Sequence, residues 1–164
     1  MTPENPPRNY WLLKTEPSSF SIEDIWNAPS RTTFWDGVRN YQARNTMRDG
    51  MKPGDLTFIY HSSCDPTGIA GIAEVARGGY PDHTAFDARD PHFDPKSKLD
   101  APTWYMVDVK ALHRFSTVVT LDELRAVKGL EKMVLLQRGS RLSVQPVTGD
   151  EWELITRTFR SRIA

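Results

Sequence analysis

The sequence predicts an α+β domain built on a small, mostly antiparallel sheet or partial barrel. Short apolar runs typical of strands are separated by short segments that open with helix-capping residues. The two kinds of element follow one another in a mixed order. A parallel, doubly wound sheet needs regular strand–helix alternation, so that class of fold is disfavoured. We expect about six strands and four or five helices.

Six segments have the short apolar or alternating pattern of strands. Segment 104–115 alternates most clearly, with Val107 and Val109 on one face and Asp108 on the other. Two strands in the middle of the chain are apolar at successive positions, which indicates burial on both faces. The predicted strands are 10–14, 32–35, 56–61, 69–75, 104–115 and 141–147.

Helix starts are marked by capping residues. Asn40 is positioned to cap a helix at 41–49, which Gly50 ends. Segment 131–137 is predicted as a further helical turn. Three capping boxes, each a Ser or Thr followed three residues later by an acid, predict the remaining helices. They are Ser21 with Asp24, Thr120 with Glu123 and Thr148 with Glu151, and they open helices at 22–26, at 121–127 and from 149.

The segment 77–103 is predicted as a long functional loop. It contains Gly78, Gly79 and four prolines but few aliphatic residues. Loops of this length inside a compact domain are usually functional or disordered. Three aromatic residues within it favour an ordered loop that packs on the rest of the domain.

Composition limits the class of protein. The chain has 164 residues, no net charge and one cysteine. Zero net charge argues against a protein that coats nucleic acid without selectivity. No apolar run approaches the ~18 residues of a membrane span, and the start lacks the pattern of a secretory signal. We expect a soluble, intracellular monomer, cytoplasmic in a bacterium and nuclear in a eukaryote, with a Pro-rich tail at 1–9 and a single domain at 10–164.

Metal, cofactor and catalytic signals are weak. His61, Cys64, His83 and His92 are possible metal donors, but only one pair has zinc-like spacing, so we expect no metal. No phosphate-binding or dinucleotide-binding glycine motif occurs, so we expect no cofactor. An enzyme using Asp108, His61 or Cys64 as acid–base or nucleophilic groups stays open as an alternative. The third alternative is a protein-interaction domain without a small ligand.

One segment has the residue types of a nucleic-acid reader. Residues 35–45 contain two aromatic side chains, two arginines and several amides. Aromatic faces stack on bases, amides read base edges and arginines bind phosphates. A pocket for an unstacked base needs this mixture. On the segment alone, Trp35 and Tyr41 could equally be core residues, since buried aromatic side chains are common.

The chain resembles the EVE domain family over about residues 10–159. The resemblance rests on motifs that follow in the family's order, and Thr15 departs from the serine that the family usually has. The motifs are Tyr10–Pro17, Trp35–Asn45, Tyr60–Ser62, Gly68–Val75, Tyr80–Asp82, Trp104–Val109 and Arg141–Pro146.

The resemblance implies a PUA-like fold, which is a partly open, mostly antiparallel β-barrel flanked by short helices. It also implies recognition of modified bases in nucleic acid, with modified cytosines in DNA as the favoured ligands and a modified RNA base as the other option. The related YTH domains use a Lys-Ser pair and a tryptophan in their base pocket. By motif order these positions correspond to Lys14, Thr15 and Trp35.

The candidate site residues follow from this reading. Trp35 is expected to stack on the base, with Tyr80 or Trp104 as a second wall. The expected base-binding set is Trp35, Lys14, Thr15, Arg39, Asn40, Tyr60, Ser62, Tyr80, Trp104, Asp108 and Gln145. The expected phosphate-binding set is Lys14, Arg39, Arg44 and Arg141. No catalytic residue and no metal ligand is assigned.

Overall fold

The computed structural model describes residues 8–139 and 141–163. Most of the predicted tail therefore lies outside the described residues. Six strands form one sheet in the order β2-β5-β4-β3-β1-β6. The β1–β3 pair is parallel and every other pair is antiparallel. The strands are β1 (Tyr10–Thr15), β2 (Thr32–Trp35), β3 (Leu56–His61), β4 (Gly68–Pro81), β5 (Tyr105–Thr120) and β6 (Val144–Val147).

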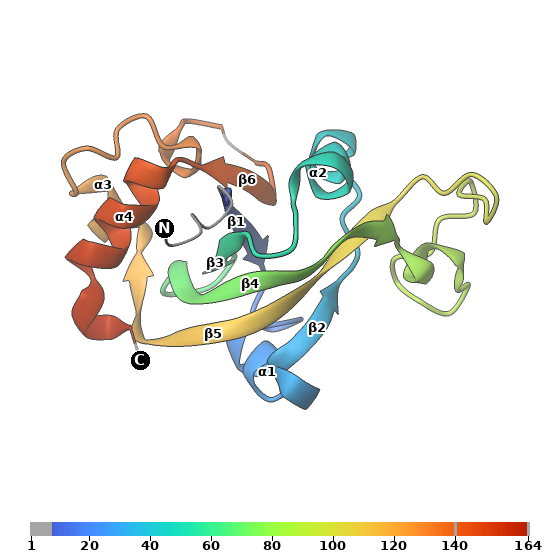
Figure 1. Ribbon diagram of the computed structural model, residues 1–164, viewed down its shortest axis with the longest axis horizontal. Helices are drawn as coiled ribbons and strands as arrows, with labels where there is room; N and C mark the ends of the chain where they lie inside the picture. Colours follow the sequence, from blue (N-terminus) through green and yellow to red (C-terminus); the bar gives the residue numbers. More distant parts are fainter. Residues whose placement is uncertain (1–7, 140, 164) are drawn as a thin grey trace, which may run out of the picture.

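The sheet curls without closing, because β2 and β6 stay at its two edges. Figure 1 shows β4 and β5 as a long twisted ribbon with α4 across one end of the molecule, the loop after β4 at the other end, and α1 and α2 on opposite sides of the middle. The helices are α1 (Ile22–Trp26), α2 (Tyr41–Asn45), α3 (Leu121–Arg125) and α4 (Gly149–Thr158). The α+β fold with a partly open, mostly antiparallel sheet is confirmed.

All three predicted capping boxes are present. At α1, α3 and α4 the Ser or Thr side chain accepts the N–H of the acidic residue three positions on, and that acid accepts the N–H of the cap residue. Asn40 caps α2 through an N–H of Ala43 at 3.0 Å. Helix α2 ends at Asn45, and residues Thr46–Gly50 continue as a wider helical turn. These caps stabilise short helices that would be marginal in isolation, together with the packing of their buried residues.

Two apolar clusters occupy the two faces of the sheet, because side chains alternate along each strand. Leu13 belongs to the first cluster with Trp35 and Val107. Leu12 belongs to the second cluster, where Phe58 stacks on Trp152 of α4 with ring centres 3.9 Å apart. Burial on both faces of β3 and β4 is confirmed.

Several predicted boundaries differ from the structure. β4 continues to Pro81, so the loop begins later than residue 77. Gly79 lies within this strand. A Cβ there would come within 2.6 Å of the backbone of Met47 and Arg48, so this glycine allows close packing and does not mark a break. β6 begins at Val144 instead of 141, and only Val134–Leu136 of segment 131–137 is helical, as a 3-10 helix. No helix among residues 8–139 and 141–163 is long and apolar enough to cross a membrane.

Candidate functional site

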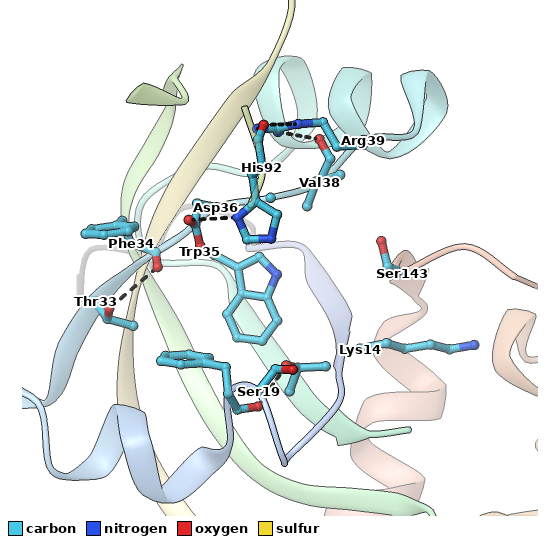
Figure 2. Close-up of a pocket in the computed structure, with 13 residues that line it drawn as sticks. Lys14, Ser19, Thr33, Phe34, Trp35, Asp36, Val38, Arg39, His92 and Ser143 are labelled. Carbon is cyan, nitrogen blue, oxygen red and sulfur yellow. Dashed lines mark hydrogen bonds and ion pairs between the residues drawn. The ribbon is translucent and has the colours of Figure 1, made fainter. Parts of the chain in front are cut away.

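A cavity of about 430 Å³ opens between the ends of β1 and β2. Three strands separate β1 from β2 in the sheet, so the curl of the sheet brings these strand ends together. The volume lies within the range of small-molecule sites. Figure 2 shows this cavity, with Trp35 near the centre of the view. Its lining residues are Lys14, Thr15, Ser19, Phe20, Thr33, Phe34, Trp35, Asp36, Gly37, Val38, Arg39, His92 and Ser143.

Trp35 belongs to both the core and the cavity. Its side chain is only 6% exposed and packs in the first apolar cluster, yet one face of it lines the cavity. The ring of Phe20 meets it edge-on, with ring centres 5.8 Å apart. The two interpretations of Trp35 offered by the sequence, core residue and pocket wall, are therefore compatible.

The last residues of β1 contribute to the cavity unequally. The hydroxyl of Thr15 donates to the carbonyl of Phe20 at 2.8 Å, which holds the segment after β1 against the strand. The side chain of Lys14 runs away from Trp35 in Figure 2, and its Nζ lies 5.7 Å from the centre of the Tyr60 ring. Burial lowers the pKa of Lys14. Lys14 thus lines the rim with its stem while its ammonium group faces the other side of the sheet.

The loop after β4 folds back over the cavity and is held there by Arg39. The guanidinium donates to the carbonyl of His92 from Nε at 3.1 Å and from Nη2 at 2.6 Å. Its Nη1 donates to Val38 O and to Asp82 Oδ2. Most of the N–H groups of Arg39 are therefore engaged within the protein. Arg39 lines the cavity, but in this structure its hydrogen bonds hold the loop in place.

Asp82 is the buried partner of Arg39. Its Oδ2 accepts from Arg39 and from the N–H of Gly37, and its Oδ1 accepts from the N–H and the hydroxyl of Thr84. Burial alone would raise the pKa of Asp82, but these hydrogen bonds from Thr84, Gly37 and Arg39 outweigh it and lower the pKa. Asp82 therefore links the turn after β2 to the loop after β4.

The ring of His92 lies on Gly37, where a Cβ would come within 2.6–2.8 Å of three ring atoms. Gly37 also has a φ of +78°, a conformation that favours glycine. The Nδ1 atom of His92 lies 3.2 Å from Asp90 Oδ1 and 3.4 Å from Asp36 Oδ2. One donor atom from each of these three residues lies within 4.8 Å of the others, so they are the described residues best placed to hold a metal ion.

The structure places most of the other predicted site residues outside the cavity. Asn40 caps α2. Trp104 is buried, donates from Nε1 to Asp94 at 2.7 Å and stacks on Tyr41. The remaining residues have structural partners or lie at the surface: Tyr60 is buried in the second cluster, Ser62 contacts Thr15 O, Tyr80 donates to Asp108, Gln145 donates to Leu142 O, Arg44 donates to Thr103 O, and Arg141 is exposed.

The groups of the enzyme alternative do not share this cavity. The imidazole of His61 accepts the N–H of Ile22 at 3.1 Å, and burial lowers its pKa. The thiol of Cys64 faces the carbonyl of Pro66 in a separate surface hollow. Asp108 accepts from Tyr80, whose pKa is raised by burial and by that bond. None of the three is among the cavity-lining residues.

The sequence reasoning missed several cavity residues: Ser19, Phe20, Asp36, Ser143 and, as a pocket group, His92. His92 was considered only as a metal donor. The available signal was the Asp36-Gly37 turn directly after Trp35, where a glycine with positive φ permits close approach of another group.

Comparisons with known proteins agree with this architecture. The family model of the EVE domain matches residues 9–158. Thymocyte nuclear protein 1 of Rattus norvegicus is 46% identical over 163 residues, which cover 90% of this chain and 72% of that protein. A solved hypothetical protein from Leishmania major superposes with a TM-score of 0.89 at 47% identity, covering 94% of this chain and 96% of that one.

A further solved structure carries a ligand. It is human THYN1 in complex with DNA containing 5-methylcytosine, with a TM-score of 0.85 at 42% identity, covering 92% of this chain and 96% of that one. The family match spans nearly all of the described residues, including every strand of the sheet and the lining of the cavity. The chain therefore belongs to the EVE domain family.

Proposed function

We propose that this protein binds DNA that carries a modified cytosine and receives the modified base in the cavity beside Trp35. The observation that carries the proposal is an aromatic-walled cavity of about 430 Å³ in a fold shared with a protein solved in complex with 5-methylcytosine DNA. A base inside a duplex cannot reach such a cavity, so the nucleotide must be rotated out of the stack or be single-stranded.

Trp35 and Phe20 supply the apolar surface that an unstacked base needs. Stacking of one base on an aromatic side chain contributes about 1–3 kcal/mol. Both rings are fixed by their edge-on contact and by the first apolar cluster, so little side-chain freedom is lost on binding. Among the predicted site residues, Trp35 and Thr15 are the two that we retain for the base.

Phosphate contacts are proposed at cations whose charged groups do not enter the cavity. Arg44 and Arg141 have side chains accessible to solvent, and Lys14 presents its ammonium group near Tyr60. With no net charge on the chain, these local cations must supply the attraction to the backbone. In a eukaryotic cell we place this binding in the nucleus, as the name of the rat relative suggests.

Fluorescence anisotropy with labelled oligonucleotides tests the proposal. Single strands and duplexes that differ at one position, cytosine or 5-methylcytosine, are titrated with the protein. We expect tighter binding to the modified strand, and we expect Tyr41→Ala, which removes an exposed aromatic outside the cavity lining, to keep that preference. Equal binding to both strands contradicts the proposal. Mass spectrometry of the recovered oligonucleotide should show it unchanged, because we propose binding without turnover.

A further inference from the structure

We propose that His92 determines specificity in this cavity by accepting a hydrogen bond from the amino group of the bound base. The inference rests on the proposed function, which requires the protein to distinguish 5-methylcytosine from thymine. Thymine carries the same 5-methyl group as 5-methylcytosine, so an apolar pocket for the methyl group cannot separate the two bases. They differ at the 4-position, where cytosine has an amino donor and thymine a carbonyl acceptor.

His92 is held at its backbone and beneath its ring. Its backbone N–H donates to Asp90 Oδ1 at 2.8 Å, and its backbone carbonyl accepts two N–H groups of Arg39. Its ring rests on Gly37 and cannot move closer. Because the backbone N–H and carbonyl of His92 are both bonded and its ring rests on Gly37, the ring nitrogen Nε2 points in one direction. Such fixation is what selective hydrogen bonding requires.

The two carboxylates beside Nδ1 favour one tautomer of the ring. Nδ1 is buried, and no described residue meets it with good hydrogen-bond geometry. The groups nearest to it are the carboxylates of Asp90 and Asp36, at 3.2 Å and 3.4 Å. An ionised carboxylate only accepts hydrogen bonds, so the hydrogen of the neutral ring belongs on Nδ1. Nε2 then carries the lone pair. Figure 2 shows Nδ1 directed at Asp36 and the second ring nitrogen on the cavity side.

The other polar groups of the lining do not discriminate in this way. The hydroxyls of Ser19 and Ser143 can donate or accept, so they suit an amino group and a carbonyl equally. Asp36 accepts only, but its carboxylate is directed at Nδ1 of His92, as Figure 2 shows. Arg39 offers donors, and most of them are engaged. Among these lining side chains of the described residues, His92 is therefore the one that offers a fixed acceptor to the cavity.

The expected size of the preference over thymine follows from the hydrogen-bonding groups that thymine would leave unpaired. Against thymine, the lone pair of Nε2 would face the lone pairs of the 4-carbonyl, and both would stay unpaired. Leaving such groups unsatisfied reduces affinity by about 10- to 100-fold. We therefore expect 5-methylcytosine to bind at least about tenfold more tightly than thymine in the same strand.

Four single-stranded oligonucleotides test the inference, with cytosine, 5-methylcytosine, uracil or thymine at one position. They vary the methyl group and the 4-substituent independently. The proposed function predicts the methyl preference, and the role of His92 predicts the amino-over-carbonyl preference. In His92→Phe we expect the second preference to fall to near unity while the methyl preference stays. Trp35→Phe should weaken all four complexes together and keep both preferences.

Matched variants separate His92 from its surroundings. His83→Phe changes the other histidine of the same loop, which packs edge-on against Phe34 and is not a lining residue, and should retain both preferences. His92→Gln offers an amide oxygen and should recover part of the amino preference that His92→Phe loses. Circular dichroism melts establish that each variant is folded at the temperature of the titration.

The outcomes are distinguishable. A parent protein without the methyl preference contradicts the proposed function. A parent with the methyl preference whose amino preference survives in His92→Phe contradicts the role of His92 alone. Loss of the amino preference on adding EDTA, and its return with one equivalent of zinc, also contradicts it, because Nδ1 would then be a metal ligand and not a hydrogen donor.

Discussion

Arg39 and Asp82 form an ion pair at 3.0 Å that joins the turn after β2 to the loop after β4. The carboxylate of Asp82 is fully buried, and the guanidinium of Arg39 is largely so. The same guanidinium holds the carbonyl of His92. One arginine therefore controls both the stability of this corner and the position of the group that covers the cavity.

Arg39→Ala should destabilise the protein and weaken base binding together. It removes the cation from a buried carboxylate, which keeps hydrogen bonds from Gly37 and Thr84, so we expect a loss of about 2–3 kcal/mol in the free energy of unfolding. Urea denaturation measures this loss. Arg48→Ala, which breaks an exposed pair with Asp49, is the control and should leave the unfolding midpoint unchanged. Equal midpoints for the two variants would contradict the fastening role of Arg39.

Stability should fall in acid partly through Glu123. The guanidinium of Arg162 binds Glu123 through two N–H groups and lowers its pKa from 4.5 to about 2. A lowered pKa in the folded state gives stabilisation that is complete above pH 4.5 and is lost as the pH falls toward 2. Glu123→Gln keeps an acceptor for the cap of α3 but loses the charge. The difference in unfolding midpoint between parent and variant should be largest at pH 7 and should shrink toward pH 2.

A matched substitution controls for the helix cap in that experiment. Glu151 has the same capping position at the start of α4. Glu151→Gln therefore reports the loss of a carboxylate at a helix N-terminus in general. If the Glu123→Gln difference stays constant from pH 7 to pH 2, the ion pair with Arg162 does not provide the stabilisation.

Local features of the fold were predictable from the sequence, and long-range ones were not. The capping boxes at α1, α3 and α4 were predictable because a cap involves atoms three residues apart. The position of His92 was not, since it meets Arg39 across 53 residues of chain. Gly79 illustrates the same limit. Its neighbours, Met47 and Arg48, come from another element, so the sequence alone suggested a loop.

The candidate site shows this division residue by residue. Trp35 and Thr15 were identified through the family resemblance and do line the cavity. Arg39 was identified as well, but its donors are mainly used inside the protein, which depends on contacts that no local pattern reveals. Asn40 suited both a base edge and a helix cap, and the structure places it at the cap.

Binding to DNA should depend weakly on salt. The chain has no net charge, and we assign few cations to phosphates, so about two to four contacts should form. The slope of log K against log salt concentration should then be about −2 to −4. Arg141→Ala should reduce the magnitude of the slope by about one while leaving the preference for 5-methylcytosine unchanged. A slope near −10, with no preference among bases, would indicate general backbone binding instead.

Trp35 should affect stability and affinity by separable amounts. Trp35→Ala removes a large side chain from the first apolar cluster and should reduce the free energy of unfolding by about 3–5 kcal/mol. Trp35→Phe keeps an aromatic ring in the core with less surface toward the cavity, so its stability loss should be smaller than that of Trp35→Ala. Its affinity for the modified base should still fall, because a smaller ring offers less area for stacking.

Trp11→Phe provides the control: Trp11 is a buried tryptophan of the same cluster that is not a lining residue, and its indole donates to Asp55 at 2.9 Å. We expect Trp11→Phe to lower the melting temperature without changing affinity at a temperature where the variant is folded. If both tryptophan variants weaken binding only in proportion to their unfolded fraction, Trp35 is a core residue and not a wall of the base pocket.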